Sequence, residues 1–476
     1  SNPYRIIRQA MLIMKGMDNS SFEENRKNHY RGIARLFRAL ATYDLVRRYG
    51  DVIWIEKLVT ESSEDVLQGK REDRDLVMDK VLADLDFAIA NIATDKDMYG
   101  FSKDMARAAK AEICLYEGTF CKYRVAEVNG KGADLERSKK YLNECVAACQ
   151  PLMSSYTLAS EYAEIYRCIS TADFSAVPEI ITGKAFKIDQ MMHQLVAYTC
   201  SSTQISGITR DAFESFLFSD GKPAASTTEN TSDVGEMDKD GNYSIAKLLE
   251  VRDKRLSYLT DPYVYCKGMT WARAGAGNMD ATTGYGVAKY DNIEMPLYNR
   301  QTIGQNYTCG PIYWLSVVLC EYAEAKAELG TLNDDDLNMS LNLLYTRAGL
   351  PTQTVASLSA INDPSNNMNV NSLIWEVRRC RRCELMCDNN FRYWDLIRWH
   401  QLELLDSNKH PNVMLGANMT ASKAYTDPEL SKDLKFTDGY LNGSLGARTY
   451  DKKYYLFPIP QDQLNLNKQL TQNPGW

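Results

Sequence analysis

The residue types best suited to chemistry gather in one stretch of the C-terminal third of the chain, where four arginines lie close to three carboxylates. These residues are Arg378, Arg379, Arg381, Arg382, Glu384, Asp388 and Asp395. Such a group could bind an anionic substrate or move a proton. It equally suits buried bidentate ion pairs that hold helices and the C-terminal segment together. Because ion-pair networks of this kind are commonly structural, we favour the second interpretation.

The twelve cysteines could bind a metal ion or form disulfides, but their spacing favours packing. Cys145 and Cys149 fall at helical spacing among apolar residues, which is typical of a helix core. Cys380, Cys383 and Cys387 also fall on one helical stripe, and no fourth ligand lies nearby. The sequence therefore predicts no metal site and no disulfide network.

Motifs of the common catalytic sites are missing from the sequence. It contains no H-E-x-x-H, no G-x-x-x-x-G-K-[ST] phosphate loop and no G-x-S-x-G elbow. The histidines show no metal-ligand spacing; they are His29, His193, His400 and His410. We expect a protein without a cofactor and without catalytic activity. A glycosidase stays open, because the separation of its two carboxylates is spatial and does not show in a sequence.

Aromatic residues are concentrated between positions 263 and 307, among glycines and amides. A flat aromatic ring can cover the apolar face of a sugar ring while polar side chains engage its hydroxyls. Alternatively, the aromatics fix long loops onto the helices. We predict a ligand site in this region, with Trp271 as the leading residue. Its predicted members are Trp271, Arg273, Asn278, Tyr285, Tyr290, Tyr298 and Tyr307.

The elements that would position these residues are mainly helices. Apolar residues recur at 3.6-residue spacing in four segments within residues 20–150, and the connections are short. This pattern predicts helical hairpins of the tetratricopeptide type. Similar patterns return within residues 310–405. The fold class is therefore expected to be mostly α, with tetratricopeptide-like helical-hairpin repeats.

A loop-rich insertion is expected between the two helical blocks, over residues 151–310. The stretch PEIITGKAFKI predicts one buried strand, and long polar runs rich in Gly, Asn and Thr follow it. Loops of this length inside a compact protein are usually functional or mobile. The insertion is therefore where we expect ligand binding.

The segment 406–476 is expected to be irregular and to end in an extended strap. Pro458, Pro460 and Pro474 remove backbone donors, so we expect no helix to run through the tail. The tail is nevertheless too rich in aromatic and apolar residues for a disordered end. It is predicted to dock on the body of the protein and to be needed for its stability.

Composition excludes some partners. The net charge is −7 and the basic residues are dispersed, which argues against nucleic acid and against an anionic membrane surface. The best apolar stretch, at 309–320, is shorter than the roughly 20 residues that a membrane span needs. The chain begins without Met and without a visible signal peptide, which suggests a trimmed protein and leaves its location open.

Four stretches, in this order, resemble the SusD/RagB family of surface-exposed nutrient-binding lipoproteins of Bacteroidetes-type bacteria. They are RGIARLFRALATYDLVRRYGDV, WLSVVLCEYAEAKAELG, VRRCRRCELMCDNNFRYWDLIRW and FPIPQDQLNLNKQLTQNPGW. The chain departs from the family pattern at Cys380, where Glu is usual, and at Cys383 and Cys387, where aliphatic residues are usual. It ends on Trp476, where the family often has Tyr.

The resemblance implies one SusD-like domain over residues 1–476. It also implies a non-catalytic glycan-binding protein on the cell surface that delivers oligosaccharide to a SusC-like TonB-dependent outer-membrane transporter. Attachment would be through an N-terminal lipid, whose cysteine and signal peptide are not in this chain. Three alternatives stay open: a peptide-binding receptor of RagB type, a glycoside hydrolase built on helical repeats, and a cytoplasmic helical-repeat adaptor.

Overall fold

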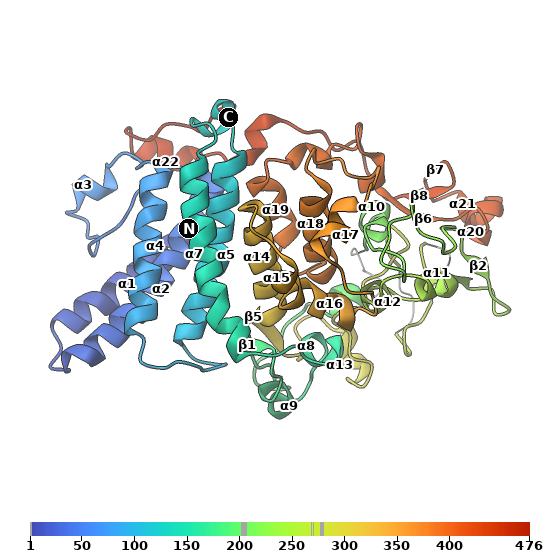
Figure 1. Cartoon of the computed structure of the whole chain (residues 1–476), viewed down its shortest axis with the longest axis horizontal. Coiled ribbons are helices and arrows are strands. Elements are labelled where there is room, and N and C mark those ends of the chain that lie inside the picture. The colour runs from blue at the N-terminus through green and yellow to red at the C-terminus, as the bar shows by residue number, and fades with distance from the viewer. Residues whose placement is uncertain (1, 201–206, 268, 270, 277–279) are drawn as a thin grey trace. The chain divides into compact units, whose positions relative to one another are not determined.

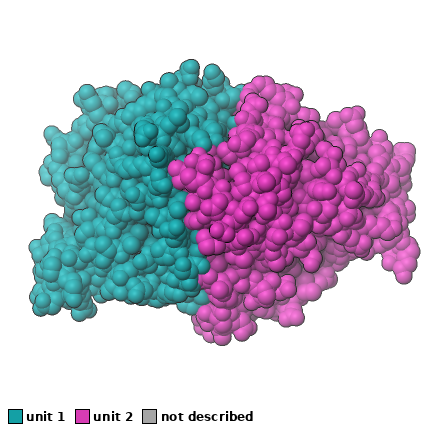
Figure 2. Space-filling view, viewed as in Figure 1, with its two compact units in different colours: residues 1–155, 393–402, 450–476 teal, residues 156–392, 403–449 magenta. Residues whose placement is uncertain are grey.

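The computed structural model describes residues 2–200, 207–267, 269, 271–276 and 280–476. They form two compact units (Figure 2). Unit 1 comprises Ser1–Ser155, Tyr393–Leu402 and Tyr450–Trp476, and unit 2 comprises Tyr156–Arg392 and Glu403–Thr449. Within the described ranges, no helix combines the length and the apolar character that crossing a bilayer requires.

Unit 1 is built from long helices that pack in the order of the sequence (Figure 1). They are α1 (Asn2–Asp18), α2 (Glu24–Tyr49), α4 (Arg74–Asn91), α5 (Lys103–Tyr123) and α7 (Leu135–Ser155), with the short α3 (Glu64–Leu67) and α6 (Ala126–Asn129) in the connections. Asp73 and Ser102 cap α4 and α5 by accepting backbone N–H bonds from Asp75 and Met105. The predicted helical hairpins within residues 20–150 are confirmed.

Helices α5 and α7 approach each other closely at Gly118. A Cβ atom there would lie 2.7 Å from Cγ of Leu142 on α7, so a larger residue would push the two helices apart. Cys145 and Cys149 on α7 are buried, as their helical spacing predicts. These residues therefore serve helix packing.

The C-terminal strap, Tyr450–Trp476, belongs to unit 1. It contains the short 3₁₀ helix η4 (Lys452–Tyr455) and the helix α22 (Gln461–Leu466). As expected, no helix passes through Pro458, Pro460 or Pro474, but the short α22 forms between Pro460 and Pro474. This helix begins directly after Pro460, and proline is tolerated at a helix start because the N–H that it lacks would have no partner in the first turn.

The strap is docked through the buried side chain of Asn473. Its Nδ2 donates to the carbonyl oxygens of Tyr49 (3.1 Å) and Phe457 (2.7 Å), and its Oδ1 accepts from Nη1 of Arg71 (2.9 Å). Arg71 also donates to the carbonyl oxygen of Thr471 at 3.0 Å. One amide and one guanidinium thus satisfy backbone groups on both the strap and the helical body.

Unit 2 contains shorter helices. Its helical elements are α8 (Tyr162–Tyr166), α9 (Thr171–Ser175), η1 (Ala197–Thr199), α10 (Arg210–Glu214), α11 (Ala246–Glu250), α12 (Lys254–Leu259), α13 (Leu297–Gln301), α14 (Leu315–Glu328), α15 (Asp334–Asn338), α16 (Leu341–Arg347), α17 (Val355–Ala360), α18 (Ser372–Glu384), η3 (Pro411–Val413), α20 (Lys423–Thr426) and α21 (Pro428–Ser431). Along the chain, α19 (Phe391–Arg398) and η2 (Leu402–Leu405) fall across the boundaries between the units. Helices α14, α16 and α18 pack together, which confirms the predicted helices within residues 310–405.

Three small antiparallel sheets complete unit 2. Strand β1 (Ile180–Lys184) pairs with β5 (Gly310–Trp314), so that Ile180 lies opposite Trp314. The second sheet has the order β2 (Glu236–Met237), β3 (Tyr243–Ser244) and β4 (Tyr263–Val264), and the third has the order β6 (Leu415–Asn418), β8 (Tyr440–Asn442) and β7 (Phe436–Thr437). The predicted buried strand is confirmed as β1. The helical block expected within residues 310–405 begins at Leu315, because residues 310–314 form β5.

The arginines of α18 are buried or half-buried and paired with carboxylates, which agrees with the structural interpretation of this cluster. The pairs are Arg378–Glu328, Arg379–Asp363, Arg379–Glu376, Arg381–Glu324 and Arg382–Asp211. They fasten α18 to α14 and α10, whereas the strap is docked by contacts within unit 1. Cys380 and Cys383 are buried on α18, but Cys387 lies beyond the end of the helix and is exposed, so the expected cysteine stripe stops at Cys383.

Replacing Asn473 tests how far unit 1 depends on the strap. Asn473→Ala removes the hydrogen bonds to the carbonyl oxygens of Tyr49 and Phe457 and to the guanidinium of Arg71. We expect the free energy of unfolding, measured in urea, to fall by about 1–3 kcal/mol. The matched control is Asn465→Ala on the exposed side of α22, where the side chain contacts only Gln461 at 3.2 Å. Equal unfolding midpoints for the two variants would show that the strap contributes little to stability.

Candidate ligand-binding site

The loops between β4 and β5 in unit 2 are joined by a buried ion-pair network. Arg273 donates from Nε to Oδ1 of Asp261 (2.8 Å) and from Nη1 to Oδ2 of Asp291 (3.3 Å). Arg300 on α13 binds the same Asp291 with two hydrogen bonds, of 2.8 Å from Nε and 2.7 Å from Nη2. All four side chains are buried. A single carboxylate, Asp291, therefore connects two arginines from separate loops.

The same arginines also bind the backbone of neighbouring segments. Arg300 donates to the carbonyl oxygens of Ala274 (2.9 Å) and Arg273 (3.0 Å), and Arg273 donates to the carbonyl oxygen of Thr199 (3.2 Å). The amide oxygen of Asn306 accepts from the backbone N–H of Ala197 at 3.0 Å. These bonds hold η1, the 271–276 loop and the 297–306 segment together.

The network keeps the carboxylate of Asp291 charged. Burial alone would raise the pKa of Asp291, but the hydrogen bond from Arg300 and the charges of Arg273 and Arg300 outweigh it, so the pKa lies below its usual value. Cys200 lies beside this carboxylate, with Sγ 3.5 Å from Oδ2 of Asp291. Burial raises the pKa of Cys200 to about 12, so Cys200 is a protonated thiol at neutral pH and not a nucleophile.

Three of the predicted ligand residues are used inside the protein. Arg273 is part of the ion-pair network. Tyr285 is only 2% exposed, and its ring stacks on Phe213 with the ring centres 4.5 Å apart. The hydroxyl of half-buried Tyr290 lies 2.8 Å from the carbonyl oxygen of Cys387 and 2.9 Å from the carboxylate of Asp388. These three residues hold the loops in place, which is the alternative role considered for the aromatic stretch.

Trp271 has the setting of a partly exposed platform. It is half-buried and packs against Tyr263, with ring centres 5.0 Å apart and planes inclined at 35°. The ring centre of Tyr265, which is itself buried, lies 6.4 Å from that of Trp271. Because Arg273 follows two residues later, the ion-pair network also fixes the backbone beside this indole. The ring is therefore positioned by the protein and not left on a free loop.

Tyr298 is the most open of the predicted aromatics. It lies on α13, two residues before Arg300, and is 66% exposed. Tyr307 is half-buried, and Asn278 lies outside the described residues. The sequence interpretation missed Tyr198, which is 36% exposed on η1, an element in contact with α13. Tyr198 stands about a hundred residues before α13 in sequence, so no local pattern could have linked it to Tyr298.

The segments that carry Tyr198 and Tyr298 also expose other large apolar side chains. An antiparallel bridge joins them, with N–H to oxygen bonds of 2.7 Å and 3.0 Å between His193 and Asn306. The exposed residues are Ile188, Met191, Leu195, Tyr198, Ile293, Leu297, Tyr298, Ile303 and Ile312. Exposed apolar side chains in this number on joined segments are typical of an interaction surface.

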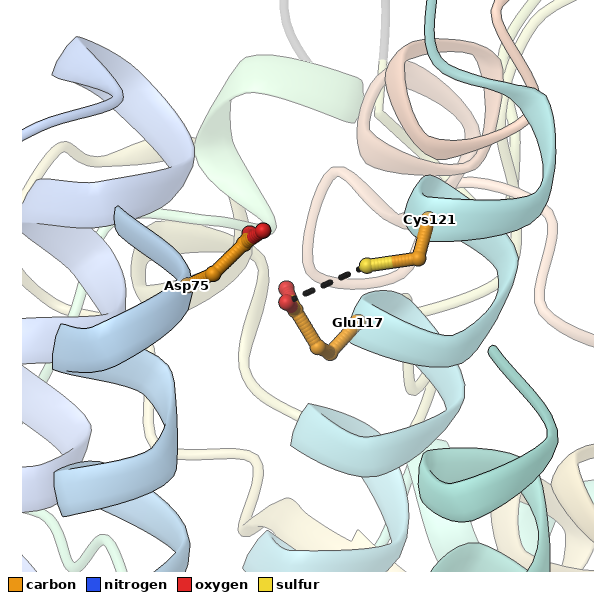
Figure 3. A group of neighbouring side chains, drawn as sticks. All are labelled: Asp75, Glu117 and Cys121. Carbon is orange, nitrogen blue, oxygen red and sulfur yellow. Dashed lines mark hydrogen bonds between the residues drawn. The ribbon is translucent and has the colours of Figure 1, made fainter. Parts of the chain in front are cut away.

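A second group with possible chemistry lies in unit 1, where Asp75, Glu117 and Cys121 point toward one another from α4 and α5 (Figure 3). Their ligand atoms all lie within 4.8 Å of one another, which would suit a metal ion. Arginines already neutralise the two carboxylates, however. Nη2 of Arg74 lies 2.6 Å from Glu117, and Nη1 of Arg124 lies 2.7 Å from Asp75. The group is therefore better suited to joining helices than to binding a cation.

The network at Asp291 predicts a specific stability defect. Asp291→Asn removes the charge between two buried arginines, and we expect the free energy of unfolding to fall by roughly 3–5 kcal/mol. In the wild type, the stability that ionised Asp291 contributes should be fully present above the pKa that an aspartate has in the unfolded chain. It should be lost as the pH falls through the lower pKa that Asp291 has in the folded protein. Unfolding curves over a pH series measure both effects.

The matched control for Asp291→Asn is Glu294→Gln, three residues away and exposed. It removes one carboxylate charge from the same segment without touching a buried arginine. A loss of stability of equal size in both variants would refute the network.

Comparison with known proteins places these loops in a family context. The model of the SusD family matches residues 197–476. A search of curated proteins finds no match. Among solved structures, a SusD-like carbohydrate-binding protein from Bacteroides fragilis superposes with a TM-score of 0.72 at 19% identity, covering 98% of this chain and 84% of that one.

Two further solved structures share the fold. Surface glycan-binding protein A from Bacteroides uniformis has a TM-score of 0.58 at 17% identity, covering 99% of this chain and 83% of that one. A laminarin-binding SusD-like protein has a TM-score of 0.55 at 17% identity, covering 100% and 84%. At such low identity these structures establish the fold alone, whereas the family model covers more than half of the chain. The chain belongs to the SusD family.

Proposed function

We propose that this protein binds glycans without catalysing a reaction and that it captures oligosaccharide at the loops of unit 2. The observation that carries the proposal is Trp271, which is half-buried and held against Tyr263 beside the ion-pair network. Membership in the SusD family supports the same ligand class. The names of two similar structures, one carbohydrate-binding and one laminarin-binding, lend further support.

Capture would occur by stacking. The indole of Trp271 would cover the apolar face of one sugar ring, and Tyr298 would extend the contact to a further unit. Tyr307 and Asn278 are proposed to engage hydroxyl groups at the rim. Because the Asp291 network already orders these loops, less conformational freedom is lost on binding, which favours affinity.

We further propose that the protein works at the cell surface, attached to the outer membrane by an N-terminal lipid. It would hand its ligand to a SusC-like TonB-dependent transporter. This part of the proposal rests on family membership. The large apolar side chains that residues 188–198 and 293–312 expose support the proposal, because a ligand or a partner could gain contact area on them.

Substitution of the two aromatics tests the site. A glycan array first identifies an oligosaccharide that the wild type binds, and calorimetry then compares Trp271→Ala and Tyr298→Ala with it. We expect each variant to lose about 1–3 kcal/mol of binding free energy, because each removes a stacking surface. The melting temperature of Tyr298→Ala should be unchanged, since this ring is largely exposed.

Tyr99→Ala, at a position 48% exposed in unit 1, is the control for a surface tyrosine. Full affinity of Trp271→Ala at unchanged stability would remove Trp271 from the site, and lost affinity with lost stability would make it a structural residue. Two observations would contradict the proposal itself. New reducing ends after incubation with polysaccharides would indicate a glycoside hydrolase, and binding confined to peptides would indicate a receptor of RagB type.

A further inference from the structure

Unit 1 contains a half-open cavity of about 670 Å³ that takes no part in the proposed glycan site. Its walls come from α1, α2, the 51–59 segment, α3 and the C-terminal strap with α22. This volume lies within the roughly 300–1,000 Å³ that is typical of small-molecule pockets. The cavity is therefore large enough to hold a ligand.

The walls of the cavity are mainly aliphatic. Leu45, Ile55 and Val66 line one part, and Ile459 and Leu470 of the strap line another. Two further lining leucines remain open to solvent: Leu67 is 46% exposed and Leu466 is 70% exposed. When an apolar ligand covers apolar surface that is otherwise in contact with water, the free energy falls, and this favours binding.

Two amide side chains of the wall have partners within the protein. Nε2 of Gln68 donates to the carbonyl oxygen of Leu466 at 3.3 Å, and Nδ2 of Asn467 donates to the carbonyl oxygen of Gly69 at 2.8 Å. A sugar or a peptide would bury many of its own polar groups against such a wall without finding partners. The lining therefore favours a ligand with a long apolar body and few polar atoms.

Two guanidinium groups give the cavity a positive character. Arg8 donates to the carbonyl oxygen of Val59 at 2.7 Å. Arg71 donates to the backbone carbonyl oxygens of Tyr49, Asp51 and Thr471, and also to the Thr471 hydroxyl and the Asn473 amide oxygen, all of which are uncharged. In the part of the chain that the structure describes, neither arginine is within 4.0 Å of a carboxylate oxygen. Lys57, by contrast, pairs with Asp65 at 2.5 Å.

The phenol of Tyr4 adds a neutral hydroxyl close to this charge. Burial raises the pKa of Tyr4 to about 12, so its hydroxyl stays protonated at neutral pH. Burial also lowers the pKa of Arg71, although the charge of Asp51 partly opposes this effect. The positive charge of Arg71 is therefore only partly compensated. Arg8, Arg71 and Tyr4 all line this cavity.

We propose that this cavity binds a single-chain aliphatic carboxylate. The alkyl chain would lie along the leucine, isoleucine and valine side chains, and the carboxylate would lie among Arg8, Arg71 and Tyr4. The hydrophobic effect supplies the affinity, and the two arginines select an anion over a neutral or cationic head group. This site is independent of the proposed glycan site, which lies in unit 2.

Calorimetry on the full chain with octanoate, decanoate and dodecanoate, each below its micelle concentration, tests the proposal. We expect the affinity to rise about fourfold with each added methylene, because each one is buried against the wall. Dodecyltrimethylammonium, with the same chain and the opposite charge, should bind at least tenfold more weakly. Equal affinities across the chain-length series would overturn the proposal, and so would equal binding of the cation.

Two matched pairs of variants locate the site. Arg8→Gln should weaken dodecanoate binding about two- to fivefold, because an exposed ion pair contributes only a modest free energy. The effect should be smaller at high salt, because salt screens the attraction between the two charges. Arg5→Gln on the same helix should have no effect, since Arg5 is exposed, lies outside the cavity wall and contacts only Asn2. Unchanged binding by Arg8→Gln would refute the assigned position of the head group.

Leu67→Glu places a carboxylate at the mouth of the cavity and should weaken dodecanoate binding about tenfold by like-charge repulsion. Leu135→Glu at the start of α7, where the leucine is 64% exposed, is its control. Both positions are exposed, so melting curves should match that of the wild type. An equal loss of dodecanoate affinity in both variants, or no loss of affinity in Leu67→Glu, would show that the carboxylate binds elsewhere.

Discussion

The packing of unit 2 depends on ion pairs between charged side chains that its helices bury, and Glu384 is the centre of that arrangement. Its carboxylate, at the end of α18, accepts from Arg255 on α12 at 3.0 Å and from Arg347 on α16 at 2.7 Å. Arg347 also binds Glu179, directly before β1, at 2.6 Å. Removing one partner would leave an uncompensated buried charge, which costs roughly 3–5 kcal/mol. Helices distant in sequence are thereby held in a single arrangement.

The same constraint explains why the loops between β4 and β5 can be long and still be ordered. Burial alone would raise the pKa of Glu384, but the charges of Arg347 and Arg255 outweigh it and hold the pKa below its usual value. Asp291 repeats this behaviour among the loops, with Arg273 and Arg300 as its partners. A carboxylate between two arginines fixes three segments at once. The loops therefore need few regular hydrogen bonds to present an aromatic ring in a set position.

The sequence predicted those parts of the fold that follow from local periodicity. Helices with 3.6-residue spacing, the buried strand before Lys184 and the docked strap were all visible in the order of residue types. The loops have no such period. Tyr285 and Tyr298 lie in similar sequence, yet one is 2% exposed and the other 66% exposed, because the tertiary fold alone decides which ring meets Phe213. Likewise, nothing in the sequence selects Asp291 as the common partner of Arg273 and Arg300.

Buried and half-buried arginines have two roles in this protein, and the role depends on the group that the guanidinium binds. A guanidinium bound to a carboxylate, as in Arg347 with Glu384, contributes stability and keeps little net charge for other contacts. Arg71 instead binds carbonyl, amide and hydroxyl oxygens, so it anchors the strap and still presents a positive charge. The strap that Arg71 anchors also supplies Ile459 and Leu470 to the cavity wall. Docking of the strap therefore completes the apolar wall and leaves the charge of Arg71 beside it. The same set of contacts gives unit 1 a stable fold and a site for an amphiphilic anion.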